Sequence, residues 1–257
     1  NKDAIAAGLQ ALMVWGMRVG VEFAELFEDR QLSNDCKAAE KKLVKAASKV
    51  YKKFLASCPA PDAPGSKQVT ALMTITGLID APKADKEFLS INGAQGFSTF
   101  YGYYMLEAMA MAGNYQGALD VIREYWGAMI DLGATSFWED FDINWIPNAA
   151  PIDELVPEGK KDIHGDCGAY CYVGFRHSLC HGWASGPTSW LSRHILGVEV
   201  IEPGCRQVRI TPHLGDLQWV KGTFPTPYGE LQIYHEKQAN GNVISEVKAP
   251  KGVSVIK

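Results

Sequence analysis

The first thirty residues carry apolar side chains at close to the helical period, and these side chains cover more than one face of the helix that they predict. The positions are Ile5, Leu9, Leu12, Met13, Val14, Met17, Val21, Phe23, Ala24 and Phe27. A helix at the surface is apolar along one stripe only, whereas a helix that is apolar on most sides is typical of a buried position. We therefore expect a helix over 4–28 that is mostly surrounded by protein.

The next segment has the pattern of an amphipathic helix, with Asn34 as its candidate N-cap. Its apolar face consists of Ala38, Leu43, Val44, Ala47, Val50, Tyr51 and Phe54. Its charged face carries Lys37, Lys41, Lys42, Lys45, Lys49 and Lys52. Because Glu40 lies among these lysines, the charged face is typical of a solvated helix surface rather than of a binding patch.

Further helices follow a connector. The stretch Cys58–Gly65 contains three prolines and one glycine, which cannot continue a helix. Gln68–Ile79 and Thr99–Ala112 then have the composition of buried helices, and Gly113 and Asn114 end one helix and cap a half-exposed successor. Buried and half-exposed helices in alternation are typical of stacked helical hairpins, so the pattern predicts a helical toroid or solenoid.

The pattern changes after this helical part. From Ala134 to Ser178 the chain is rich in Trp, Asp, Gly, Pro, Cys and His and keeps no period, and a loop of that length is usually functional. Helical spacing returns over Pro187–Leu196 and stops at Gly197. Beyond Val198 apolar residues alternate at a period of two between Gly and Pro turns, which predicts a small β-sandwich-like domain.

Composition narrows the range of partners. The 257 residues include 25 Lys and Arg against 29 Asp and Glu, a net charge of −4, so there is no basic field to attract nucleic acid. Arg18 and Glu22 interrupt the longest apolar stretch, Ala4–Leu26, so we expect no membrane span. The chain begins at Asn1 directly in a helical pattern, so we expect it to be a piece of a longer polypeptide whose compartment cannot be read from it.

Three carboxylates lie between aromatic residues in the segment Gly133–Asp142, which contains the run Phe-Trp-Glu-Asp-Phe-Asp. Aromatic faces hold pyranose rings, and a desolvated carboxylate gains basicity, so this combination is suited to sugar chemistry. The alternative interpretation is an acidic loop that caps a helix.

A second segment combines three cysteines with three histidines between His164 and His181. Thiolate and imidazole are the preferred ligands of zinc, but Cys180 and His181 are adjacent and no C-x-x-C pair occurs. We therefore expect buried thiols and polar loop histidines, and no metal. The sequence also lacks a P-loop, a dinucleotide fingerprint and a serine nucleophile elbow, so no cofactor is expected.

A series of motifs runs in order from Gly133 to Gly229. They are Gly133-Ala-Thr-Ser-Phe-Trp-Glu139, Ser178-Leu-Cys-His181-Gly-Trp-Ala-Ser-Gly-Pro187, Trp190-Leu191, Leu196-Gly197, Pro203-Gly204, Pro212 and Gly222-Thr-Phe-Pro-Thr-Pro-Tyr-Gly229. Together they resemble the C-terminal part of the bacterial α-L-rhamnosidases of the inverting type, glycoside hydrolase family 78. The resemblance covers most of the chain, and its specific elements are the G-A-T-[ST]-x-W-E motif and the S-L-x-H-G-W-x-x-G-P motif downstream of it.

The resemblance implies a mainly α protein with a small β domain at its C-terminal end. Residues 1–198 would form the C-terminal portion of an (α/α)6 catalytic barrel, a helical toroid. Residues 199–257 would form the β-sandwich-like C-terminal domain. The substrate implied is a rhamnosyl-containing oligosaccharide, polysaccharide or glycoside, from which the parent enzyme removes terminal α-L-rhamnosyl groups with inversion.

Roles for individual residues also follow from the resemblance. Glu139 is implied as the general base and His181 as a residue lining the sugar subsite, with Trp138, Trp183 and Asp140 as further substrate-binding residues. An inverting enzyme needs its acid and base roughly 6.5 to 9.5 Å apart on opposite faces of the sugar, whereas the carboxylates near Glu139 share one loop. The general acid is therefore expected in the rest of the parent chain, and the fragment alone is expected to be inactive.

Two alternatives stay open on the sequence. One is a non-catalytic carbohydrate-binding or assembly module built on a degenerate barrel. The other is an (α/α)6 glycosidase or lyase that acts on a different sugar. An acidic residue placed across from Glu139 by the upstream part of the parent chain would distinguish an enzyme from a binding module.

Overall fold

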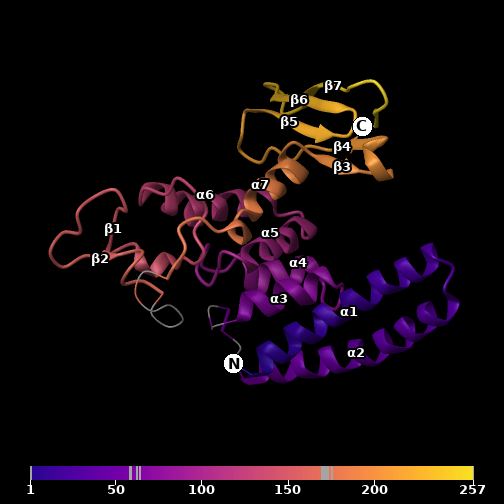
Figure 1. The fold of residues 1–257 in the computed structure, drawn as a ribbon, viewed down its shortest axis with the longest axis horizontal. Coiled ribbons are helices and arrows are strands. Elements are labelled where there is room, and N and C mark those ends of the chain that lie inside the picture. Colours follow the sequence, from indigo (N-terminus) through magenta and orange to yellow (C-terminus); the bar gives the residue numbers. More distant parts are fainter. Residues whose placement is uncertain are drawn as a thin grey trace.

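The computed structural model describes residues 2–57, 60–61, 63, 65–168, 174 and 176–256. The helices are α1 (Lys2–Leu26), α2 (Arg30–Ser57), α3 (Ser66–Ile75), α4 (Ala81–Ala84), α5 (Tyr101–Met111), α6 (Tyr115–Asp131) and α7 (Gly186–Trp190). The π-helical turns Asp85–Leu89 and Leu191–Ile195 continue α4 and α7, and 3-10 turns cover Ile143–Trp145, Gly182–Ala184 and Pro203–Cys205. The strands are β1 (Ala149–Ala150), β2 (Lys161–Asp162), β3 (Val198–Val200), β4 (Gln207–Ile210), β5 (Trp219–Thr226), β6 (Gly229–Lys237), β7 (Val243–Lys248) and β8 (Ser254–Ile256). The predicted order, a helical part followed by a β-sheet region, is confirmed (Figure 1).

Helices α1 and α2 form a hairpin that projects from one end of the molecule (Figure 1). The Oδ1 atom of Asp29 accepts a hydrogen bond from the N–H of Leu32 at 2.9 Å and so caps the start of α2. The prediction that Asn34 is the N-cap is wrong, because Asp29 lies at the turn itself and Asn34 falls inside the helix. The buried face of α2 includes Tyr51 and Phe54, and its lysines are exposed as predicted.

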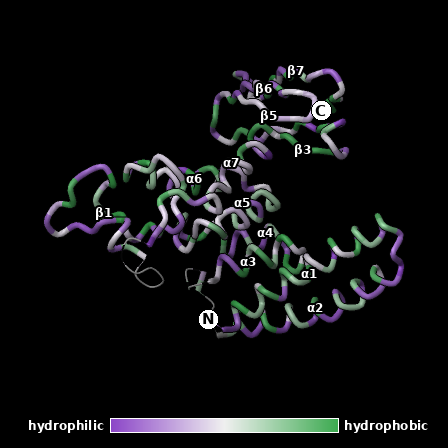
Figure 2. Tube along the Cα trace, viewed as in Figure 1, coloured by the Kyte–Doolittle hydropathy of each residue, from purple (hydrophilic) through white to green (hydrophobic). Residues whose placement is uncertain are grey.

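The two faces of α1 differ in the size of their side chains. Small residues, among them Ala7, Ala11 and Val14, are buried. The large apolar residues that remain exposed on α1 are Ile5, Leu9, Met13, Trp15, Val19, Phe23 and Leu26. The expectation that protein surrounds most of this helix is wrong for the described chain, because α2 and α3 cover only the side that carries the small residues. Figure 2 shows how hydrophobic residues are distributed along the trace of α1.

Helix α1 is also long and apolar enough to cross a membrane, judged by length and composition alone. Core helices of globular proteins meet the same criterion. The expectation of no membrane span therefore stays a prediction.

The central helices supply the main hydrophobic core. Helix α3 contacts α1 on one side and α5 on the other, and α5 in turn contacts α7 and α6. Met105, Leu106 and Met109 of α5 are buried, as are Tyr125 and Trp126 of α6. The connector predicted at 58–65 lies partly outside the described residues.

The turn between α5 and α6 has the predicted chemistry. Gly113 adopts the left-handed conformation with φ of 77°, which an L side chain rarely adopts. The side chain of Asn114 accepts a hydrogen bond from the N–H of Gly117 and caps α6. Both predictions for this turn are confirmed.

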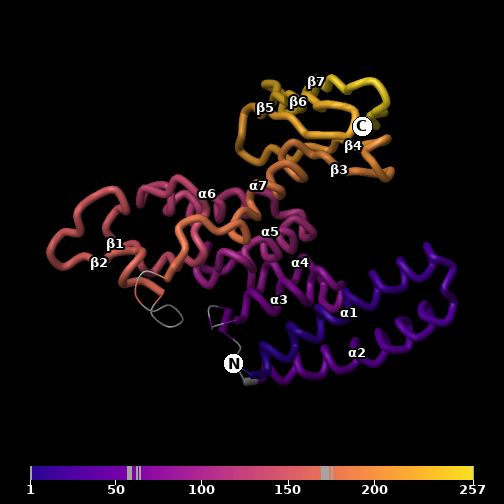
Figure 3. Tube along the Cα trace, viewed as in Figure 1, coloured from indigo at the N-terminus to yellow at the C-terminus, as the bar shows by residue number. Residues whose placement is uncertain are grey.

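A long, mostly irregular segment connects α6 to α7. Figure 3 shows it leaving the end of α6, passing through β1 and β2 and returning to α7. The two short strands pair in parallel, Ala149 opposite Lys161 and Ala150 opposite Asp162. The described residues of this loop are mostly irregular, as the absence of a helical or strand period in this part of the sequence predicts.

The C-terminal strands form two three-stranded sheets. One has the order β3-β4-β8 and the other β5-β6-β7. Val198, Val208 and Ile210 from the first sheet and Leu231 and Ile233 from the second share one buried cluster. The period-two alternation of the sequence thus becomes one apolar side of each sheet, turned toward the same core.

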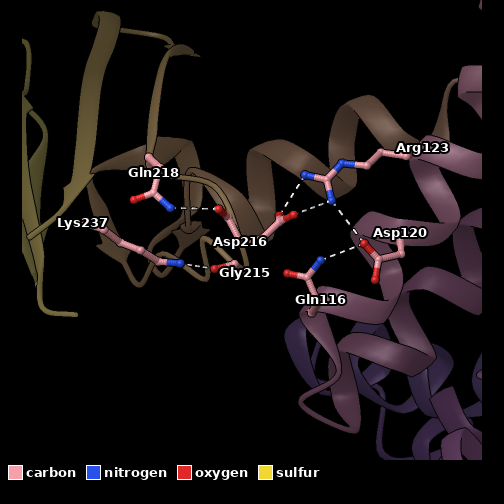
Figure 4. A network of polar contacts seen from close by, with 7 residues as sticks. All are labelled: Gln116, Asp120, Arg123, Gly215, Asp216, Gln218 and Lys237. Carbon is pink, nitrogen blue, oxygen red and sulfur yellow. Dashed lines mark hydrogen bonds and ion pairs between the residues drawn. The ribbon is translucent and has the colours of Figure 1, made fainter. Parts of the chain in front are cut away.

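A polar network connects the β-sheet region to helix α6 (Figure 4). The Arg123 guanidinium donates two hydrogen bonds, at 2.8 and 2.9 Å, to the carboxylate of Asp216, which follows β4 in the chain. Lys237 at the end of β6 donates to the carbonyl oxygen of Gly215. The hydrogen bond from Arg123 holds the pKa of Asp216 below its ordinary value.

Candidate active site around Glu139

Two segments far apart in the sequence meet at the candidate site. The N–H of Glu139 donates to the carbonyl oxygen of Ser178 at 2.8 Å, and the N–H of His181 donates to the carbonyl oxygen of Phe137 at 2.6 Å. The two sequence motifs therefore lie side by side, joined by backbone hydrogen bonds. Their pairing brings Glu139 and His181 together.

The carboxylate of Glu139 has a defined position. Its Oε2 atom accepts a hydrogen bond from the N–H of Ser178 at 3.0 Å. The same oxygen lies 3.9 Å from Nδ1 of His181. The Glu139 side chain is 15% exposed, so it is largely shielded and still reachable from solvent. A carboxylate held in this way can accept a proton from a water molecule without first losing its geometry.

The backbone carbonyl of Glu139 accepts two hydrogen bonds from side chains. The donors are the hydroxyl of Thr99 and Nε1 of Trp183, each at 2.6 Å. The Trp183 ring lies 4.2 Å from that of His181, centroid to centroid, and the residue is 45% exposed. Trp183 thus combines two properties, a contact that fixes Glu139 and an aromatic surface beside His181.

Trp183 is one of the residues that line an open groove of about 830 Å³. The other aromatic lining residues of the groove are Phe100, Tyr103 and Tyr104 of the α5 region and Phe224 of β5. Polar residues of α7 and of the turn that continues it, together with residues of β3, also line the groove. The Phe100 and Trp183 rings lie 5.8 Å apart. Aromatic side chains are therefore clustered on one side of the candidate site.

Trp138 and Asp140 occupy different environments from that of Glu139. Trp138 has no exposed surface, and its ring packs edge-on against Phe141. Its Nε1 has no hydrogen-bond acceptor among the described residues. The Trp138 side chain therefore points from the loop into the hydrophobic core. The Oδ1 atom of Asp140 accepts from the N–H of Phe141, so this carboxylate helps to shape its own loop.

Sequence reasoning missed three groups that contact the Glu139 segment. Ser178 binds the carboxylate through its backbone N–H, so only its place in the S-L-x-H motif could have indicated it. Thr99 carries no signal in the sequence, because its contact depends on how α5 approaches the loop. The sequence predicts a polar loop histidine at His177, whereas the Nε2 atom of this buried residue accepts a hydrogen bond from the N–H of Asp140 at 3.0 Å.

The described residues contain no group of three His, Cys, Asp or Glu side chains that could hold a metal ion. Cys171, one of the candidate zinc ligands, lies outside them. Cys167 is a buried free thiol, and burial raises its pKa.

Comparisons with known proteins extend this description. Residues 197–256, which contain strands β3 to β8, match the family described as the bacterial alpha-L-rhamnosidase C-terminal domain. A GH78 family rhamnosidase of Bacillus sp. GL1 is similar in structure, with a TM-score of 0.67 over 94% of this chain and 21% sequence identity. The chain has the fold of the C-terminal part of an α-L-rhamnosidase.

Further rhamnosidase structures are also similar to this chain. The α-L-rhamnosidase from Aspergillus terreus has a TM-score of 0.68 over 95% of this chain, at 17% identity. The Streptomyces avermitilis α-L-rhamnosidase, solved in complex with L-rhamnose, has a TM-score of 0.60 over 96% of it, also at 17% identity. The chain spans 25% of the Bacillus rhamnosidase, 27% of the Aspergillus enzyme and 22% of the Streptomyces enzyme. No curated protein sequence is similar enough to this chain to count as a match.

Proposed function

We propose that this chain is the C-terminal part of a glycoside hydrolase that removes terminal α-L-rhamnosyl groups with inversion, and that Glu139 is its general base. The observation that carries the proposal is the Glu139 carboxylate, which the Ser178 N–H holds 3.9 Å from the imidazole of His181 on a rhamnosidase fold. In the reaction, Glu139 removes a proton from the attacking water while a general acid on the other face of the sugar protonates the leaving oxygen.

The general acid belongs to the rest of the parent protein in this proposal. Asp140 and Asp142 are the nearest acidic residues in the sequence, and both accept hydrogen bonds from backbone N–H groups of their own loop. Acid and base must lie roughly 6.5 to 9.5 Å apart with room for a water molecule, which one short loop is poorly suited to provide. The chain covers about a quarter of the related rhamnosidases, so most of such an enzyme lies outside it.

The proposed architecture is a partial (α/α)6 barrel over residues 1–198 with a β-sandwich-like domain over 199–257. Helices α1, α3, α5 and α7 contact one another in that order, which supports a layer of helices on the inner side of the barrel. Helix α2 contacts α1 and helix α6 contacts α5, as helices on the outer side would. The exposed apolar side chains of α1 support the same proposal, because the next part of a barrel would cover them. The shared core of the two C-terminal sheets supports the sandwich.

Substrate binding is proposed for His181, Trp183 and Asp140. His181 and Trp183 offer an imidazole and a half-exposed indole next to Glu139. Trp138 is proposed to support the loop from below, since it has no exposed surface. The substrate class is a rhamnosyl-containing glycoside, oligosaccharide or polysaccharide, in keeping with the L-rhamnose bound to the Streptomyces relative.

The test is hydrolysis of p-nitrophenyl α-L-rhamnoside by the full-length parent, by this chain and by a Glu139→Gln parent. We expect activity in the parent only, with kcat of the Glu139→Gln variant about 10²- to 10⁴-fold lower. Glu154→Gln, which changes an exposed carboxylate in the same connecting loop, is the matched control and should leave kcat unchanged. An active Glu139→Gln parent would exclude the role of Glu139. An inactive wild-type parent would favour a different sugar or a binding module.

A further inference from the structure

Four hydrogen bonds fix the backbone at Glu139. Three involve its own peptide groups, through Thr99, Trp183 and the carbonyl of Ser178. The fourth is made by the N–H of Asp140, which belongs to the same peptide as the Glu139 carbonyl and donates to Nε2 of His177 at 3.0 Å. His177 directly precedes Ser178, the residue whose N–H binds the Glu139 carboxylate, so one short segment holds both the backbone and the side chain of Glu139.

The environment of His177 selects one form of its imidazole. The ring is fully buried and forms a T-shaped pair with the ring of Trp145, 6.1 Å between centroids. Its Nδ1 atom lies 3.2 Å from the carbonyl oxygen of Ile163, which can only accept a hydrogen bond. Its Nε2 atom faces the N–H of Asp140, which can only donate. Both contacts are satisfied together by the neutral ring that carries its hydrogen on Nδ1.

We propose that His177 is a positioning residue for Glu139. As a neutral hydrogen-bond acceptor, His177 fixes the Glu139–Asp140 peptide and connects it to the loop that contains Ile163. The fixed peptide in turn holds the Glu139 carboxylate 3.9 Å from His181. This inference rests on the proposed function, because it gives His177 its effect through the general base. A displacement of about 1 Å at a reacting group can lower a rate by about 100-fold, so a contact of this kind has a kinetic effect without touching the substrate.

Two substitutions separate the two hydrogen bonds of His177 in the full-length parent. In His177→Asn the side-chain amide retains a donor near the position of Nδ1 and loses the acceptor for Asp140. In His177→Gln the longer side chain retains an acceptor near the position of Nε2. We expect kcat of His177→Asn to fall about 10- to 100-fold with KM nearly unchanged, and kcat of His177→Gln to stay within about threefold of the wild type.

A matched control separates positioning from stability. His235 is also fully buried and bonded through both ring nitrogens, to Ser245 and to the carbonyl of Leu196, but it lies in the β-sheet region. His235→Asn should lower the melting temperature and leave kcat unchanged. If kcat of the His177 variants follows their melting temperatures, or if His177→Asn is as active as His177→Gln, the inference is wrong. A wild-type parent without rhamnosidase activity would overturn the proposed function first and this inference with it.

Discussion

Glu139 and Ser178 hold each other through two hydrogen bonds across 39 positions of the sequence. The N–H of Glu139 donates to the carbonyl of Ser178 at 2.8 Å, and the N–H of Ser178 donates to the Glu139 carboxylate at 3.0 Å. Backbone donors do not change rotamer, so they place a charged side chain more firmly than another flexible side chain would. The proposed base is therefore preorganised in the absence of substrate.

His181 is expected to act mainly in sugar binding. Its imidazole lies 3.9 Å from the Glu139 carboxylate and 4.2 Å, between centroids, from the ring of Trp183, and its side chain is 31% exposed. His181→Ala in the parent enzyme should raise KM about tenfold, by removing a polar contact to the substrate, with a smaller change in kcat. Steady-state kinetics with p-nitrophenyl α-L-rhamnoside measure both values. An unchanged KM would contradict this assignment.

The apolar face of α1 is expected to be an internal contact of the parent protein. Leu9 and Phe23 are 55% and 56% exposed on this face. The double variant Leu9→Glu, Phe23→Glu should reduce self-association of this chain, measured by sedimentation, because it removes exposed apolar area. In the parent it should instead lower the melting temperature, because the same positions would be buried. Leu32→Glu, at an exposed position of α2, is the control and should have a small effect in both. If the double variant leaves the melting temperature of the parent unchanged, this face of α1 is not covered in the parent.

Stability is expected to depend on pH through His213. Its ring stacks on Tyr115 at 3.7 Å and lies beside α6, and burial, assisted by the nearby His194, lowers its pKa below the ordinary value near 6.5. The unfolded chain binds a proton at His213 more readily than the folded chain does. The free energy of unfolding is therefore highest above the ordinary pKa and decreases as the pH falls through the lowered one. The melting temperature should fall between pH 7.5 and 5, and His213→Phe should reduce that slope while it keeps the stacked ring. An identical slope in both proteins would show that another group is responsible.

Gly197 is expected to tolerate no side chain. It has φ of 72°, and an added Cβ would lie 2.3 Å from the backbone carbon of Thr211. Gly197→Ala should therefore reduce the free energy of unfolding by about 3 kcal/mol or more, since backbone atoms cannot move aside cheaply. Gly241 also has a positive φ, of 83°, but has open space around it, so Gly241→Ala should cost only about 1 kcal/mol. Chemical denaturation of both variants makes the comparison. Equal losses would mean that the strand β3 region adapts to the added carbon.

Much of the secondary structure follows from local chemistry that the sequence displays. Gly113 and Asn114 end one helix and begin the next because the conformational freedom of glycine and the side-chain acceptor of asparagine act within a few residues. The cap of α2 was mispredicted for a related reason. Asp29 and Asn34 are both good caps, and the position of the turn after α1 decides between them.

The candidate site was predicted in part. Glu139, His181 and Trp183 are close together in space, as the two motifs suggested. The complete burial of Trp138 could not be predicted, because an aromatic residue in an acidic loop can point outward or into the core with the same sequence pattern. The contacts of Thr99 and His177 with the Glu139 loop depend on segments 37 to 40 positions away in the chain.

The sequence by itself determined the helical and strand periods, the capping chemistry and the residues available for catalysis, because these depend on neighbours within one or two turns of chain. Only the tertiary structure decided which residues surround Glu139, that His177 is buried and accepts a hydrogen bond from Asp140, and that the small side chains of α1 are buried while most of its large apolar ones are exposed. These outcomes depend on how whole elements pack. Packing is selected by the shape and burial of surfaces assembled from distant parts of the chain, which no local pattern contains.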